Sequence, residues 1–121
     1  NNGAVGALAM RTGTEIICVL ATGTMWVEVP PTIRLTLTGA LQPGVLPRDL
    51  CYRIARNFSN GSFGAEWDYR VIEITGPAVE PMSLAERVPL CNTLTELGVA
   101  NVFFPPSEAI RGKPYRRAVP T

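Results

Sequence analysis

Strand-like and helix-like segments alternate along this chain, and their order is what most constrains the fold. The strand-like segments are rich in β-branched residues and short, and the helix-like ones carry apolar residues at helical spacing. In chain order they are residues 32–41 (strand), 47–58 (helix), 68–76 (strand), 83–97 (helical) and 99–105 (strand). This order is typical of an α/β layer, and the connections are long enough for parallel strands joined by right-handed crossovers. We therefore expect an α/β fold, a layered sheet with flanking helices.

The second helical segment is predicted to be interrupted. Ser83 and Glu86, in the sequence SLAE, fit a capping box that begins a helix. Pro89 has no N–H to donate and its ring crowds the preceding turn, so we expect that helix to break there. A new helix should then run from about residue 90 to 97 and end at Gly98.

Residues 1–25 are interpreted as a helical N-terminal segment. The glycines at positions 3 and 6 allow either a close approach of two backbones or a tight helix start. Residues 15–23, EIICVLATG, predict a short and mostly buried helix that ends at Gly23.

Composition indicates one domain without a strongly charged surface. A chain of 121 residues, 46% of them hydrophobic, can bury one core, so a single domain over residues 1–121 is expected. The formal net charge of +1 gives no electrostatic footprint for nucleic acid or a membrane, and the apolar runs are shorter than the roughly 20 residues of a membrane span. The basic residues 111–121 are interpreted as a solvated tail, with docking on an acidic partner as the alternative.

The cysteines do not form a recognisable framework. Cys18, Cys51 and Cys91 are odd in number and far apart, so neither a disulfide pattern nor a metal knuckle follows from them. We interpret them as buried, reduced thiols of a cytoplasmic protein.

Catalytic chemistry is limited because the chain has no histidine. The commonest general base and metal ligand is therefore missing, which disfavours a self-contained hydrolase or zinc enzyme. Asn92 and Glu96 are four residues apart, so both side chains lie on one face of a helix. An amide beside a carboxylate can orient a hydroxyl while the carboxylate accepts or donates its proton. Spacing alone favours a solvated helix face over an active site.

Three motifs in order carry a resemblance to a known family. GAVGALAMRTGTEIICVLATGTMW is followed by TIRLTLTGALQPGVLPRDL and then by VIEITGPAVEPMSLAERVPLCNTLTELGV. Together they resemble the inner part of the aconitase family, above all the large subunits of 3-isopropylmalate dehydratase and homoaconitase. The resemblance extends from about Gly3 to Pro114 and implies an aconitase-like domain.

The resemblance also implies roles for three residues. Members of the family are hydro-lyases that move a hydroxyl between adjacent carbons of a hydroxy-polycarboxylate, with a [4Fe–4S] cluster acting as a Lewis acid. By matching position, Asn92 corresponds to the family asparagine near the cluster, a substrate-binding role, and Glu96 to the catalytic glutamate beside the bound hydroxyl. Cys91 matches a family cysteine that is not a cluster ligand.

The departures from the family pattern concern two motifs that complete the active site in members of the family. The family's Asp-Ser-His-Thr motif would fall before Asn1, and its cluster cysteines lie downstream of the matched region. Cys18, Cys51 and Cys91 are unsuited in spacing to replace them. We therefore expect residues 1–121 alone to hold no metal or cluster and to show no dehydratase activity.

The sequence leaves two hypotheses open. The chain is either part of, or a relative of, an aconitase-type hydro-lyase whose site is completed by remaining domains or another subunit. Alternatively, it is a free-standing, non-catalytic module for binding or oligomerisation, which we would expect to form a homo-oligomer. Whether the chain is itself an enzyme depends on which of the two holds.

Overall fold

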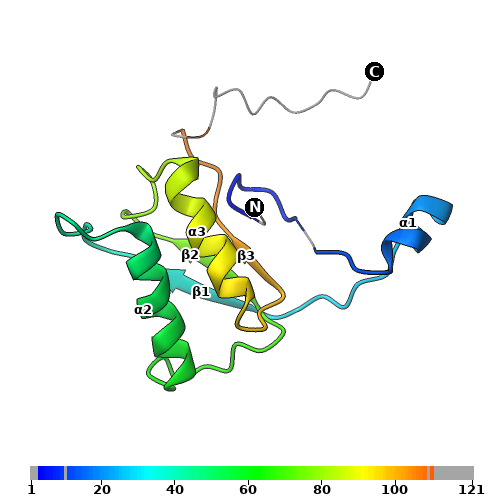
Figure 1. Cartoon of the computed structure of the whole chain (residues 1–121), viewed down its shortest axis with the longest axis horizontal. Coiled ribbons are helices and arrows are strands. Elements are labelled where there is room, and N and C mark those ends of the chain that lie inside the picture. The colour runs from blue at the N-terminus through cyan, green and yellow to red at the C-terminus, as the bar shows by residue number, and fades with distance from the viewer. Residues whose placement is uncertain (1–2, 10, 109, 111–121) are drawn as a thin grey trace.

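A three-stranded parallel sheet organises the protein. In the computed structural model, which describes residues 3–9, 11–108 and 110, the strands are β1 (Thr32–Thr36), β2 (Val71–Thr75) and β3 (Asn101–Phe103), in the order β1-β2-β3 (Figure 1). Both neighbouring pairs are parallel. The predicted α/β fold and the parallel pairing are therefore confirmed.

The two longer helices lie on one face of this sheet. Figure 1 shows α2 (Pro47–Ser59) and α3 (Leu84–Thr95) side by side in front of the strands, and the two helices contact each other. Apolar residues on the facing side of the strands meet them, because the register places Ile33 opposite Ile72. Among the described residues, the fully buried apolar side chains are Ala4, Cys51, Phe58, Ile72, Ile74, Leu90, Cys91, Leu94, Val102 and Phe104.

On the opposite face of the sheet, β1 and the middle of β2 carry polar side chains. Arg34 and Glu73 are paired in the β1–β2 register, and the Arg34 Nε donates a hydrogen bond of 3.2 Å to Glu73 Oε2. Such a face can meet water, so the described residues form two layers.

The N-terminal residues extend the sheet beside β3. The Gly3 N–H donates to the Val102 carbonyl at 2.9 Å, and the Phe104 N–H donates to the Gly3 carbonyl at 3.1 Å. A Cβ at Gly3 would collide with the Val102 carbonyl oxygen and the Phe103 backbone. Of the two uses expected for the first glycines, a close backbone approach is the one observed here.

Helix α1 (Ile16–Thr22) occupies only part of the expected helical segment and projects from the domain (Figure 1). It ends where predicted, because Gly23 adopts φ 72° and its N–H donates to the Val19 carbonyl at 2.8 Å. The expected burial is wrong, since no residue of α1 is buried and Leu20 is 81% exposed. The cause is that α1 packs against no other helix or strand among the described residues.

The predicted break at Pro89 is also wrong, because α3 continues through it as one helix. The proline removes one backbone hydrogen bond, but Leu90, Cys91 and Leu94 beyond it are fully buried, and their packing outweighs that loss. The predicted capping box is present, and the Ser83 N–H donates to Glu86 Oε2 at 2.8 Å. The helix ends at Thr95, two residues earlier than expected.

A buried arginine, which the sequence did not reveal, joins α3 to two loops. The Arg87 side chain is fully buried and stacks over the Phe104 ring, with its guanidinium carbon 5.3 Å from the ring centroid. Its nitrogens donate to the carbonyls of Met82, Val79 and Pro105 and to the Ser107 hydroxyl. Arg87 therefore connects the loops that follow β2 and β3.

Two further expectations concern the surface. No helix within the described ranges is long and apolar enough to cross a membrane. The basic tail, residues 111–121, lies outside the described residues.

Candidate functional site

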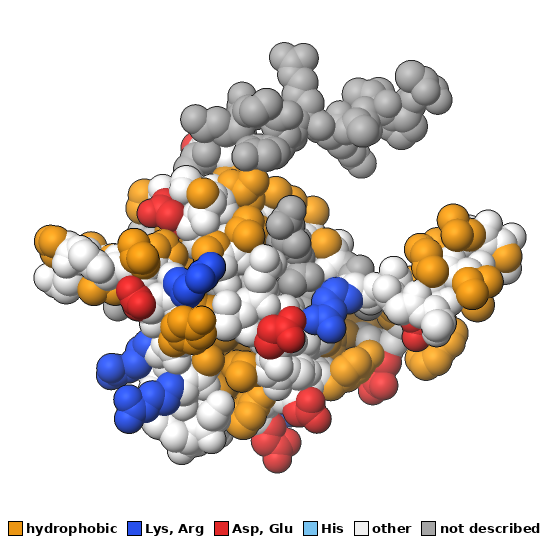
Figure 2. All heavy atoms as spheres, in the orientation of Figure 1, with side chains coloured by type: hydrophobic (Ala, Val, Ile, Leu, Met, Phe, Trp, Pro, Cys, Tyr) orange, Lys and Arg blue, Asp and Glu red, His pale blue; other side chains and the backbone are white. Residues whose placement is uncertain are grey.

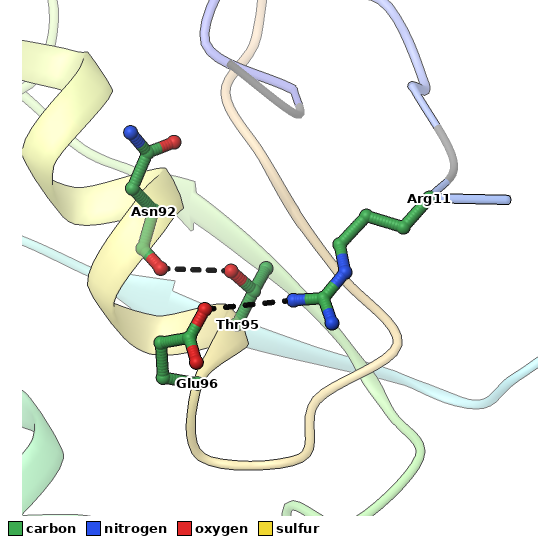
Figure 3. Close-up of polar contacts among 4 residues, drawn as sticks. All are labelled: Arg11, Asn92, Thr95 and Glu96. Carbon is green, nitrogen blue, oxygen red and sulfur yellow. Dashed lines mark hydrogen bonds and ion pairs between the residues drawn. The ribbon is translucent and has the colours of Figure 1, made fainter. Parts of the chain in front are cut away.

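The C-terminal end of α3 presents Asn92 and Glu96, the two residues that the sequence singled out. Asn92 lies in the last turn of the helix and Glu96 caps its end, one turn later, and both side chains are exposed (Figure 3). Leu94, between them, points into the core and is fully buried. The four-residue spacing thus places the amide and the carboxylate on the exposed side of the helix end, where a ligand can reach them.

A local hydrogen bond closes the end of the helix beneath this pair. The Thr95 hydroxyl donates to the Asn92 backbone carbonyl at 2.8 Å (Figure 3). The bond satisfies one of the carbonyls that the helix end leaves without a partner. It involves only the backbone of Asn92, so the Asn92 amide remains exposed at the surface.

Arg11 faces Glu96 from the N-terminal segment and was not identified from the sequence. Its Nη1 lies 3.6 Å from Glu96 Oε1, with side chains that are 68% exposed for Arg11 and 77% for Glu96 (Figure 3). An exposed pair of this kind stabilises a fold by only about 0–1 kcal/mol, so it does not close the site to ligands. The 85 positions between the two residues explain why spacing could not reveal the contact.

Asn101 binds the backbone of the N-terminal segment at Ala9. This residue begins β3, is only 2% exposed, and its Nδ2 donates to the Ala9 carbonyl. Its Oδ1 is buried without a hydrogen-bond partner. Asn101 was predicted only as a strand residue, because its partner lies 92 positions away in the chain.

The thiols of the chain do not fit an iron–sulfur cluster. Burial raises the pKa of Cys91 to about 12, and burial likewise raises the pKa of Cys51, so both stay protonated at neutral pH. Cys18 lies on the projecting α1 and is exposed, so the expectation that all three are buried is wrong for this residue. Nowhere in the described part of the chain do three or more His, Cys, Asp or Glu residues gather to hold a metal ion. Cluster binding requires thiolates that converge, and these do not.

The structure belongs to the class of parallel α/β proteins, with an exposed amide and carboxylate at one helix end. Comparison with known proteins shows its family. The family model described as "Aconitase family (aconitate hydratase)" matches residues 1–112. The chain belongs to the aconitase family.

Curated relatives agree with this assignment. The chain is 38% identical over 109 residues to the 3-isopropylmalate dehydratase large subunit 1 of Methanopyrus kandleri, covering 88% of this chain and 25% of that protein. It is 37% identical over 108 residues to the probable methanogen homoaconitase large subunit of Methanosarcina mazei, covering 88% and 26%. The 3-isopropylmalate dehydratase large subunit of Wolinella succinogenes is 38% identical over 101 residues, covering 83% of this chain and 23% of that protein. The chain spans about a quarter of the length of these relatives.

Proposed function

We propose that this chain supplies one half of the active site of an aconitase-type hydro-lyase. The observation that carries the proposal is the exposed pair of Asn92 and Glu96 at the end of α3, within a chain of this family. The names of the relatives suggest 3-isopropylmalate or a homoaconitase substrate as the compound acted on.

The two side chains have complementary tasks in this proposal. The Asn92 amide hydrogen-bonds the substrate hydroxyl and holds it in one orientation. The Glu96 carboxyl group gives a proton to that hydroxyl as it leaves as water, and takes the proton back in the hydration direction. The proton on the neighbouring carbon is removed by a base outside residues 1–121.

The remaining groups, including any cluster ligands, come from outside the described residues. The cysteines of this chain do not converge, so no step is assigned to a cluster held by them. Reconstitution with iron and sulfide should therefore give residues 1–121 no absorbance typical of a [4Fe–4S] centre. Appearance of that absorbance would contradict the proposal that the cluster ligands lie outside residues 1–121.

The kinetic test uses the complete product of the gene that carries this chain. Glu96→Gln should lower kcat for dehydration of 3-isopropylmalate by about 10²-fold or more, the usual loss when a general acid is removed. Glu73→Gln is the matched control, since Glu73 also faces an arginine but on the open face of the sheet, and it should leave kcat unchanged. Equal kcat values for both variants would refute the role of Glu96.

A second function is favoured by the exposed apolar side chains of α1 and the segment after it. Leu20 is 81% exposed and Trp26 is 87% exposed, which suits a surface that binds another protein or a second copy. The reading frame separates the two functions. Coding sequence that continues upstream into Asp-Ser-His-Thr and downstream into cluster cysteines supports the hydro-lyase. A start near Asn1 and a stop after Thr121 support a free-standing binding module.

A further inference from the structure

Arg11 is held loosely by Glu96, so its guanidinium is available to a ligand. The 3.6 Å between Arg11 Nη1 and Glu96 Oε1 exceeds the 2.7–2.9 Å of a charge-assisted hydrogen bond. The Arg11 side chain is 68% exposed, so most of it faces solvent. An arginine offers five donors in a planar fork, so it can contact Glu96 and a second carboxylate together.

The N-terminal segment that precedes Arg11 is attached at the edge of the sheet, independently of this ion pair. Gly3 is hydrogen-bonded to both Val102 and Phe104, and Asn101 holds the Ala9 carbonyl two residues before Arg11. The Asn101 Oδ1 is buried and accepts no hydrogen bond, which is unfavourable in itself.

The space beside Arg11 is large enough for a small organic acid. A half-open hollow of about 620 Å³ lies between the α1 segment and the body of the domain, and Arg11, Trp26 and Tyr69 line it. Glu15 and Glu28 also line the hollow and disfavour a carboxylate next to them. Asn92 and Glu96 do not line it, and Arg11 is the lining residue that contacts Glu96, so a ligand carboxylate would bind at Arg11.

We propose that Arg11 binds a carboxylate of the substrate while Asn92 and Glu96 contact the substrate hydroxyl. The proposal rests on the proposed function and deepens it by adding a third residue from this chain. The ligand class is a 2-hydroxy dicarboxylic acid, whose hydroxyl and second carboxylate are a few bonds apart. Arg11 forms a forked pair with that carboxylate and thereby orients the hydroxyl toward α3.

The test is a titration of the 121-residue chain, followed by NMR, with (S)-malate and with lactate. Lactate keeps the 2-hydroxy acid but lacks the second carboxylate. Arg11→Gln should weaken malate binding about 10-fold and leave lactate binding unchanged. Arg11→Lys should have an intermediate effect, because lysine keeps the charge but lacks the paired donors of the guanidinium. Arg34→Gln is the control, since Arg34 forms an exposed ion pair with Glu73 on the open face of the sheet.

The outcomes separate this inference from the proposed function. Malate that shifts the signals of Asn92 and Glu96 equally in wild type and Arg11→Gln overturns the role of Arg11 and leaves the proposed site standing. Malate that shifts neither signal in wild type overturns the role of Arg11, because the proposal requires this chain to bind the acid through Arg11, Asn92 and Glu96. The proposed half-site is then judged separately, by the kinetics of Glu96→Gln in the complete product of the gene. Equal weakening by Arg11→Gln and Arg34→Gln shows a general charge effect and also overturns the role of Arg11.

Discussion

At the scale of single residues, Arg87 holds the loops that follow β2 and β3. Burial lowers the pKa of its guanidinium, and the nearby Glu80 opposes that shift. Its partners are the carbonyls of Met82, Val79 and Pro105 and the hydroxyl of Ser107 rather than a carboxylate. Arg87 thus donates hydrogen bonds to four oxygens, and its loss would leave buried oxygens without donors.

We predict that Arg87→Met lowers the free energy of unfolding by about 3 kcal/mol or more, because it strands several buried acceptors at once. Methionine keeps much of the length of the side chain, so the loss reports hydrogen bonds more than volume. Urea denaturation followed by fluorescence measures it. Arg34→Met, at an exposed position, should cost less than about 1 kcal/mol, and similar losses for both variants would contradict this account.

At the scale of elements, α3 combines a well-defined start with a proline in its interior. The Ser83 backbone N–H and hydroxyl both donate to Glu86 Oε2, at 2.8 and 2.7 Å. These hydrogen bonds lower the pKa of Glu86, the side-chain bond being the larger cause. A carboxyl group whose pKa is lowered by folding adds stability above its usual pKa, and the stability is lost as the pH falls through the lowered value.

Glu86→Ala should therefore destabilise the protein by about 1 kcal/mol at neutral pH, the typical cost of losing a cap. The difference from wild type should begin to shrink as the pH falls below the ordinary glutamate pKa of about 4.3, and should vanish as the pH falls through the lowered pKa of Glu86. Thermal unfolding at several pH values measures both effects. Glu66→Ala removes an exposed glutamate outside the helices and should change stability little at any pH. A pH-independent difference for Glu86→Ala would argue against the cap.

Sequence predicted the elements of this fold better than their junctions. The alternation at Ile33 and Leu35 and the first-position Pro47 are local signals, so strand β1 and helix α2 followed from them. Continuation of α3 past Pro89 depends on the burial of Leu90 and Leu94 against other elements, which no local pattern contains. Packing against residues that are distant in sequence therefore determines that α3 continues past Pro89.

The same limit applies to the candidate site. Asn92 and Glu96 follow from helical periodicity and from the family motif, because both signals lie within one turn of chain. Arg11 and Asn101 meet partners that lie 85 and 92 positions away in the chain, where the N-terminal segment pairs beside β3 through Gly3. These contacts arise from tertiary structure, so a single sequence does not show them.

At the scale of the whole molecule, the projecting α1 and the segment after it expose apolar surface that water does not favour. Figure 2 shows hydrophobic side chains gathered over the projecting part. Ile17 is 66% exposed, and Trp26 and Val29 are each 87% exposed. Contiguous apolar surface of this kind is typical of a site that another protein surface covers. In a longer chain the additional residues would cover it, and in the isolated chain a second copy is the available partner.

We therefore predict that residues 1–121 self-associate and that Leu20→Glu prevents it, because a charge on α1 would have to be buried in the interface. Size-exclusion chromatography with light scattering at several concentrations measures the mass, which for a monomer is 13.1 kDa. Tyr52→Glu is the control, since Tyr52 is 57% exposed on α2, away from α1, and should leave the association intact. A wild-type mass of one chain at every concentration would show that the apolar surface of α1 does not pair with itself. The binding-module function would then require a different partner.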